Sequence, residues 1–176
     1  MKSVIFILIM SVALAAGQLA GAAPAVLGFA VDMREKGAKG DGTSDDTAAF
    51  SAALATGKKV LCHSGDTYLV NSGLVATAPY QVIDMRGCKV KMKTGASGFG
   101  LLTLTGIGET VIGGEWDGNK SGNPPILEGG SATPTTSQWV IKSSADRQTL
   151  DSVWIHDGSG HGRDCSIHTN ATRKIS

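Results

Sequence analysis

The chain has 176 residues, of which 16 are basic and 15 acidic, giving a formal net charge of +1 at pH 7. This balance excludes a general electrostatic attraction to nucleic acid or to an anionic membrane, so a neutral or locally recognised partner is expected. The length suits one domain. The 24 glycines and the 41% share of hydrophobic residues favour β structure with many turns over disorder or long helices.

The N-terminus predicts a secretory signal peptide over residues 1–23. Lys2 precedes an apolar run at 4–16, and small residues follow at 20–23, which is the three-part order of such a signal. The run is short for a membrane span, and a retained N-terminal anchor is the alternative. We therefore expect a secreted or extracytoplasmic protein that begins near Pro24 and has no stable membrane partner after cleavage.

A short strand and a tight turn precede one helix. Alternating apolar residues at 29–33 indicate the strand, and the stretch GAKGDGTSDDTAAF at 37–50 combines turn glycines with Asp45 and Asp46. These carboxylates suit the positive end of a helix dipole, and Gly57 suits the position after the helix. The aspartates lack the ligand spacing of an EF-hand loop. We therefore expect a capped helix here and no metal site.

After the helix the sequence changes to short strands. They are separated by Gly, Asn, Asp or Ser and read KKVLCHS, GDTYLV, QVIDMRGCKVKMKTG, LLTLTG, ETVIGGEWDGN, SQWVIKSS and LDSVWIHDGSG. The pattern shows no second helix of useful length, which excludes a βαβ sheet. Apolar segments at 82–84, 110–114 and 152–156 recur about 28 and 42 residues apart. Repeats of this kind favour a solenoid of β coils.

Cysteine spacing and known catalytic motifs add few constraints. Cys62, Cys88 and Cys165 do not have the spacing of a zinc site. A Cys62–Cys88 disulfide and buried free thiols are both compatible with the sequence. The chain contains no Gly-x-Ser-x-Gly elbow, phosphate-binding loop or His-Glu-x-x-His motif, and no cofactor is expected.

The segment from Val31 to Val70 carries a resemblance to a known superfamily. VDMREKGAKGDGTSDDTAAFSAALATGKKVLCHSGDTYLV resembles the N-terminal signature of the pectate-lyase-like proteins, which include polygalacturonases, rhamnogalacturonases and phage tailspike depolymerases. The matching residues are Gly40, Asp41, Gly42, Asp45, Asp46, Thr47 and Phe50, followed by Gly65, Thr67 and Tyr68. The sequence departs at 63–66, where the family has prolines before the glycine. The resemblance implies an all-β fold, a right-handed parallel β-helix (solenoid) with a short N-terminal capping α-helix.

The same resemblance implies the domain organisation and a function. Residues 24–176 would form the N-terminal coils of a single β-helix domain that is truncated at its C-terminus. The expected protein is the N-terminal part of a glycoside hydrolase or polysaccharide lyase that acts on pectin-like or other acidic polysaccharide. A noncatalytic carbohydrate-binding or adhesive β-helix, or an inactive fragment, is the alternative. In each active form the partner is a polysaccharide or oligosaccharide.

Two catalytic candidates lie near the C-terminus. Gly160-His161-Gly162 resembles a polygalacturonase motif, and Arg163-Asp164-Cys165 resembles in part an Asp-Asp-Cys motif of the same family, so His161 and Asp164 are the candidates. The order of the two motifs departs from the family, and generic turn and strand residues are the alternative. An inverting glycosidase needs two carboxyl groups about 6.5 to 9.5 Å apart. The sequence identifies no such pair.

Two further residues are candidates for substrate binding. Trp116, in the stretch GEWDGN, could stack on the apolar face of a sugar or pack in the core, and Trp154 raises the same question. Asp157 could approach Asp164 on an adjacent turn, or serve only as a turn residue. The lysines at 89–93 form a basic strand face that could meet acidic sugars or solvate the sheet.

Overall fold

In the computed structural model, the described residues are 28–71, 73–96, 100–123, 139–158 and 167–169. The expected signal peptide at 1–23 lies outside these ranges, as do His161 and Asp164. The described chain is mostly β structure with one α-helix and one short 3₁₀ helix, η1. In chain order the elements are β1 (Ala30–Asp32), η1 (Met33–Lys36), β2 (Asp41–Asp45), α1 (Thr47–Leu54), β3 (Lys59–Leu61), β4 (Thr67–Val70), β5 (Leu74–Ala76), β6 (Val82–Asp84), β7 (Lys89–Met92), β8 (Gly100–Leu104), β9 (Thr110–Ile112), β10 (Glu115–Asp117), β11 (Trp139–Ser143), β12 (Thr149–Asp151), β13 (Trp154–His156) and β14 (Ile167–Thr169).

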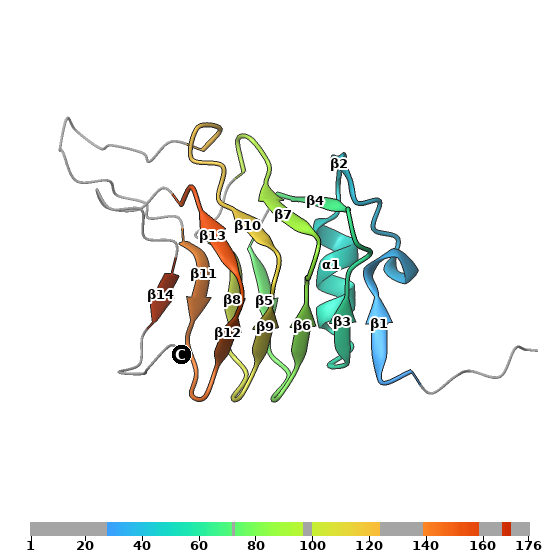
Figure 1. Ribbon diagram of the computed structural model, residues 1–176, viewed down its shortest axis with the longest axis vertical. Coiled ribbons are helices and arrows are strands. Elements are labelled where there is room, and N and C mark those ends of the chain that lie inside the picture. Colours follow the sequence, from blue (N-terminus) through green and yellow to red (C-terminus); the bar gives the residue numbers. More distant parts are fainter. Residues whose placement is uncertain (1–27, 72, 97–99, 124–138, 159–166, 170–176) are drawn as a thin grey trace, which may run out of the picture.

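The strands form three parallel sheets, which we name A, B and C (Figure 1). Sheet A has the order β1-β3-β6-β9-β12, sheet B has β13-β10-β7-β4-β2, and sheet C has β14-β11-β8-β5. From β3 onward the chain passes through A, B and C in that order on every circuit. All strand pairings recorded among the described residues are parallel. This topology is compatible with a parallel β-helix, and it confirms the expected predominance of β structure.

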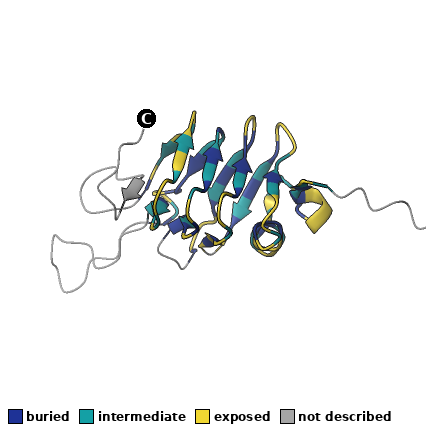
Figure 2. Ribbon diagram, turned by 90° about the horizontal axis from the view of Figure 1, so that it is seen from below, coloured by how far each residue is buried: buried dark blue, intermediate teal, exposed yellow. Residues whose placement is uncertain are grey.

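Stacked apolar side chains fill the space between the sheets. In sheet A the partners Val31, Val60, Ile83 and Val111 occupy equivalent positions on successive strands, and each is at most 4% exposed. In sheet B the partners Tyr68, Val90 and Trp116 on β4, β7 and β10 are likewise fully buried, because successive residues of a strand point to opposite faces. Figure 2 shows the result: buried residues concentrate on the strands, and exposed residues concentrate in the connecting loops and on η1.

The aspartates before α1 form the local bonds of a turn and a helix start. The Asp45 carboxylate accepts hydrogen bonds from the amide (3.0 Å) and hydroxyl (2.6 Å) of Thr47, the first helical residue. Asp46 is buried and accepts bonds from the amides of Lys39 and Gly40 at 2.7 and 3.1 Å. The Asp45 bonds support the expected cap at the start of the helix, whereas Asp46, the N-cap residue, makes no side-chain bond to the helix and instead stabilises the preceding turn.

The helix α1 covers one end of the stacked coils. Phe50 and Leu54 are buried, and the Phe50 ring meets the Tyr68 ring edge-on at a centroid distance of 6.4 Å. The Leu54 carbonyl accepts a bond of 2.9 Å from the Gln81 side chain. Helix and first coil therefore share one apolar core.

One row of polar side chains also lies inside this core. Gln81, Glu109 and Gln148 directly precede Val82, Thr110 and Thr149, which pair with one another across sheet A. The Glu109 carboxylate is fully buried and accepts bonds from the Gly106 amide (2.9 Å) and from Gln148 (3.0 Å). Burial raises the pKa of Glu109 to about 7. Glu109 therefore keeps its proton to a higher pH than an ordinary carboxyl group does, and in this row it lies between Gln81 and Gln148.

A disulfide joins Cys62, just after β3, to Cys88, just before β7, with a Cα–Cα distance of 6.5 Å. Of the two cysteine arrangements compatible with the sequence, the structure has the bridged one, which ties one circuit of the chain to the next. Within the described ranges, no helix combines the length and the apolar character needed to cross a membrane.

Candidate functional site

A row of outward-facing residues crosses sheet B. Thr67, Lys89, Glu115 and Trp154 occupy equivalent positions on β4, β7, β10 and β13. We call this row the outer ladder. It exists because all four strands are parallel and in register, so one residue from each circuit is brought to the same line. Neighbouring strands lie about 4.8 Å apart, so the ladder extends over roughly 14 Å.

A second row lies two residues further along the same strands. Lys91 pairs with Asp117, which pairs with His156, on β7, β10 and β13. The residues between the two rows, Val90 and Trp116, are fully buried. The alternation of a three-residue strand therefore places Glu115 and Asp117 on the outer face and Trp116 in the core.

Lys89 is the centre of an ion-pair network on this face. Its ammonium nitrogen lies 2.5 Å from Oε1 of Glu115 and 3.1 Å from Oδ2 of Asp117. The hydrogen bond from Lys89 lowers the pKa of Glu115. Burial alone would raise the pKa of Asp117, but bonds from the Asn119 amide and from Lys89 outweigh it and hold that pKa below its ordinary value. Both carboxyl groups are therefore ionised at neutral pH.

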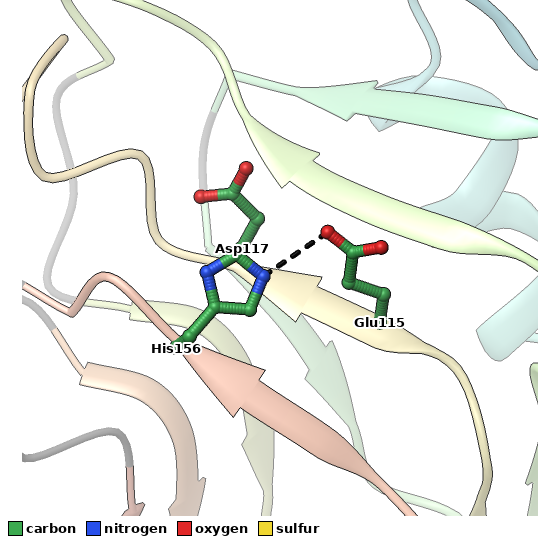
Figure 3. Close-up of side chains that lie close together, drawn as sticks. All are labelled: Glu115, Asp117 and His156. Atoms are coloured by element: carbon green, nitrogen blue, oxygen red, sulfur yellow. Dashed lines mark hydrogen bonds and ion pairs between the residues drawn. The ribbon is translucent and has the colours of Figure 1, made fainter.

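His156 joins the network to the exposed tryptophan. Its Nε2 lies 3.1 Å from Glu115 (Figure 3), and its Nδ1 lies 2.9 Å from Asp157. Burial disfavours the charged imidazole, yet the bonds to Asp157 and Glu115 outweigh it, so the pKa of His156 is raised. The His156 ring also packs on the Trp154 ring, with centroids 4.8 Å apart. His156 thus holds the indole from one side.

Trp154 lies at the edge of an open pocket. The side chain is 62% exposed, and the pocket has a volume of about 390 Å³. Three glycines in its lining contribute no side chains, and its polar side chains are those of Asp66, Thr67, Lys89 and Glu115. The lining residues are Gly65, Asp66, Thr67, Gly87, Cys88, Lys89, Gly114, Glu115 and Trp154. We call this pocket the groove.

Asp66 forms the wall of the groove at its other end. It is only 6% exposed, and it accepts two bonds from Arg34 at 2.6 and 2.9 Å and one from the Tyr68 hydroxyl at 2.8 Å. Burial alone would raise the pKa of Asp66, but these bonds from Arg34 and Tyr68 outweigh it and lower that pKa. The Arg34 guanidinium is thereby held in a bidentate pair.

Glu115, Asp117 and His156 are also close enough to be considered as metal ligands. One ligand atom from each lies within 4.8 Å of the others, and Figure 3 shows the imidazole between the two carboxylates. The Lys89 ammonium already contacts both carboxylates and supplies the positive charge that a cation would supply. We therefore describe the cluster as an ion-pair network.

The structure places Trp116 and Asp157, two of the candidates proposed from the sequence. Trp116 is fully buried, and its indole nitrogen donates a bond of 3.1 Å to the Gly113 carbonyl. Of its two alternatives the structure therefore favours core packing, because a ring without exposed surface cannot stack on a sugar. Asp157 lies beside the groove through its contact with His156. His161 and Asp164 lie outside the described residues.

Sequence reasoning did not identify Glu115 and His156 as parts of a site. The available signal was the alternation of Lys-x-Lys, Glu-x-Asp and Trp-x-His on strands of the same sheet. The predicted basic face is real, but its lysines are paired. Lys89 contacts Glu115, Lys91 lies 3.6 Å from Asp117, and Lys93 lies 3.7 Å from Asp45.

Two solved structures are similar to this chain. The ORF18 protein of Geobacillus virus E2 matches with a TM-score of 0.55 and 14% identity over 73% of this chain. The Dettilon tailspike protein matches with a TM-score of 0.50 and 19% identity over 80% of this chain. The chain spans 26% and 27% of their respective lengths. No protein-family model and no curated protein matches. At these identities the likeness shows a shared fold.

Proposed function

We propose that this chain forms coils of a right-handed parallel β-helix that binds polysaccharide in the groove on sheet B. The observation that carries the proposal is Trp154, a large aromatic side chain with 62% exposure at the edge of a polar groove. The pectate-lyase-like sequence signature and the similarity in fold to a tailspike protein support it. Catalysis is not needed to account for the groove.

The groove has the two kinds of surface that a sugar requires. The exposed face of the Trp154 indole can pack on the C–H face of a pyranose ring, as aromatic rings do with apolar surfaces. Glu115 and Thr67 supply polar groups along the same line, and carboxylates form strong hydrogen bonds with hydroxyl donors. An extended glycan would lie across the strands, along the outer ladder.

Binding fits the groove better than hydrolysis does. A glycosidase needs one carboxyl group with a raised pKa to act as the acid and a second, ionised carboxylate. In the groove both Glu115 and Asp117 have lowered pKa values and share one lysine. Among the described residues the groove therefore provides no proton donor of the carboxyl type. A hydrolase or lyase activity through His161 and Asp164 remains the second candidate, on the motif resemblance alone.

Export is part of the same proposal. A polysaccharide ligand lies outside the cytoplasm in most settings, and the N-terminal pattern at 1–23 predicts a secretory signal. An adhesive role at a surface is the form of the function that agrees with a noncatalytic groove.

The test compares Trp154→Ala with Tyr80→Ala in the full chain. Tyr80 is a matched control because it is 64% exposed and lies outside the groove. Affinity electrophoresis against a panel of neutral and acidic polysaccharides, followed by calorimetry, would measure binding. We expect Trp154→Ala to lose about fivefold in affinity, since an aromatic contact contributes about 1 kcal/mol, and Tyr80→Ala to bind as the wild type. A folded wild-type chain that binds no polysaccharide would contradict the function.

A further inference from the structure

We infer that the groove selects neutral, hydroxyl-rich sugar units and rejects sugars that carry a carboxylate. This inference rests on the polysaccharide-binding function proposed above and names its ligand class. It reverses the expectation of an acidic polysaccharide that the sequence raised.

The first cation, Lys89, has its charge fully matched by protein carboxylates. Its ammonium has three N–H donors, and Glu115 and Asp117 lie 2.5 and 3.1 Å from the nitrogen. A sugar carboxylate would have to displace one of them or share the ammonium with both, close to two like charges. Displacing Asp117, which is only 4% exposed, would leave that carboxylate with Lys91, at 3.6 Å, as its remaining cationic partner. Weakening a buried ion pair in this way is unfavourable.

The second cation, Arg34, is engaged in the same way. Its Nε and Nη2 atoms both donate to Asp66, at 2.9 and 2.6 Å. Asp66 is buried, so an incoming carboxylate that took the guanidinium would leave Asp66 with the neutral Tyr68 hydroxyl as its remaining short contact. Lys89, the cation that lines the groove, and Arg34, which contacts the lining residue Asp66, are therefore both held by protein carboxylates.

The balance of charge around the groove also opposes an anion. The permanently charged cations are Arg34, Lys89 and Lys91, and the carboxylates are Asp66, Glu115, Asp117 and Asp157. Carboxylates outnumber these cations by one, and counting His156 as charged only makes the numbers equal. Electrostatic complementarity, which steers charged ligands to their sites, is absent for an acidic sugar.

Neutral hydroxyl groups, in contrast, have an available hydrogen-bond acceptor in the groove. Oε1 of Glu115 accepts from Lys89 and is paired with His156, whereas Oε2 accepts no hydrogen bond from any described residue. Glu115 lines the groove between Lys89 and Trp154, so a sugar hydroxyl that donates to Oε2 would place its ring near the indole. A hydrogen bond to an ionised carboxylate is stronger than one between neutral groups. The free acceptor and the exposed aromatic face thus favour a neutral pyranose.

The experiment uses matched pairs of polymers that differ in charge. Dissociation constants would be measured at pH 8 and low salt for polygalacturonate against its methyl ester, and for carboxymethyl cellulose against hydroxyethyl cellulose. We expect the full chain to bind the neutral member at least tenfold more tightly in the pair that it recognises. Tighter or equal binding of the acidic member with loss on Trp154→Ala would overturn the neutral preference and leave the binding function standing. Binding to no polymer of the wider panel would overturn both.

A charge-neutralising variant tests whether the pairing of Lys89 is the cause of the preference. Glu115→Gln removes one carboxylate from Lys89, so it should raise affinity for the acidic member about fivefold, the size of one partly exposed ion pair. Glu35→Gln is the control, because Glu35 is exposed on η1, lines no part of the groove and loses the same charge. Circular dichroism would verify that both variants fold. An unchanged preference in Glu115→Gln would contradict the inference.

Discussion

Trp116 and Trp154 lie on neighbouring strands of sheet B and differ completely in exposure. Trp116 pairs in register with Ile155, and Trp154 pairs with Glu115, so the two indoles are one register position apart. Trp116 is fully buried and Trp154 is 62% exposed. A shift of one residue changes the face of a sheet to which a side chain points. Strand register, and not residue type, therefore determines which tryptophan lies in the core and which lies at the groove.

The largest expected effect is on the buried member of this pair. Trp116→Ala should lower the free energy of unfolding by about 3 to 5 kcal/mol, the usual cost of removing a large aromatic side chain from a core. Trp154→Ala should change it by less than about 1 kcal/mol, because that ring is mostly solvated. Urea unfolding monitored by circular dichroism would measure both. Equal losses of unfolding free energy in the two variants would contradict the different burial of the two tryptophans.

A smaller effect is expected from the polar row inside the core. Since burial raises the pKa of Glu109 to about 7, the folded chain keeps a proton that the unfolded chain has released at pH values between the ordinary carboxyl pKa and about 7. The free energy of unfolding should therefore fall as pH rises through this window, by about 2 to 3 kcal/mol from this group.

Glu109→Gln isolates that contribution, because the amide does not titrate. The difference in unfolding free energy between the variant and the wild type should change between pH 5 and pH 8 in favour of the variant. Denaturant unfolding at several pH values would measure it. Asp151→Asn, which removes an exposed carboxylate from the same sheet, is the control. A difference that stays constant with pH would show that Glu109 does not retain its proton.

The smallest effect concerns the support of the exposed indole. His156→Gln should weaken polysaccharide binding about threefold, since it removes a ring contact with Trp154 that contributes under about 1 kcal/mol. His156→Phe keeps an aromatic ring at the position and should bind better than the Gln variant. Calorimetry with the best polymer of the panel would measure all three proteins. If the Phe and Gln variants lost the same affinity, ring packing would not be the role of His156.

The strands could be predicted from the sequence where alternation was clear. The lysines at 89–93 predict a strand with one basic face, and in β7 the alternating residues Val90 and Met92 are buried. The strand β2 at Asp41–Asp45 was missed, because glycine, aspartate and serine have low strand propensity. The strand β2 nevertheless pairs with β4, and the Asp41 carboxylate stabilises its local conformation by accepting bonds from the amides of Thr43 and Ser44.

The contacts within the site could not be predicted, because the number of residues between equivalent positions on neighbouring strands varies. Lys89 and Glu115 are 26 positions apart, whereas the path from Glu115 to Trp154 is longer and includes the segment 124–138. A repeat of unequal length does not reveal which residues meet across a sheet. The sequence therefore identified the tryptophans and lysines as candidates but not the contacts of Glu115 and His156.

The three residues of strand β10 lie in two different environments. Its middle residue belongs to the stacked interior, and its first and third residues belong to the outer face. Substitution of Glu115, the more exposed of the two outer residues, would alter the outer face while the interior stays intact. An added circuit of the chain would lengthen the outer ladder by one residue without moving the others. Such a scaffold can change and extend its outer surface at little risk to its own folding.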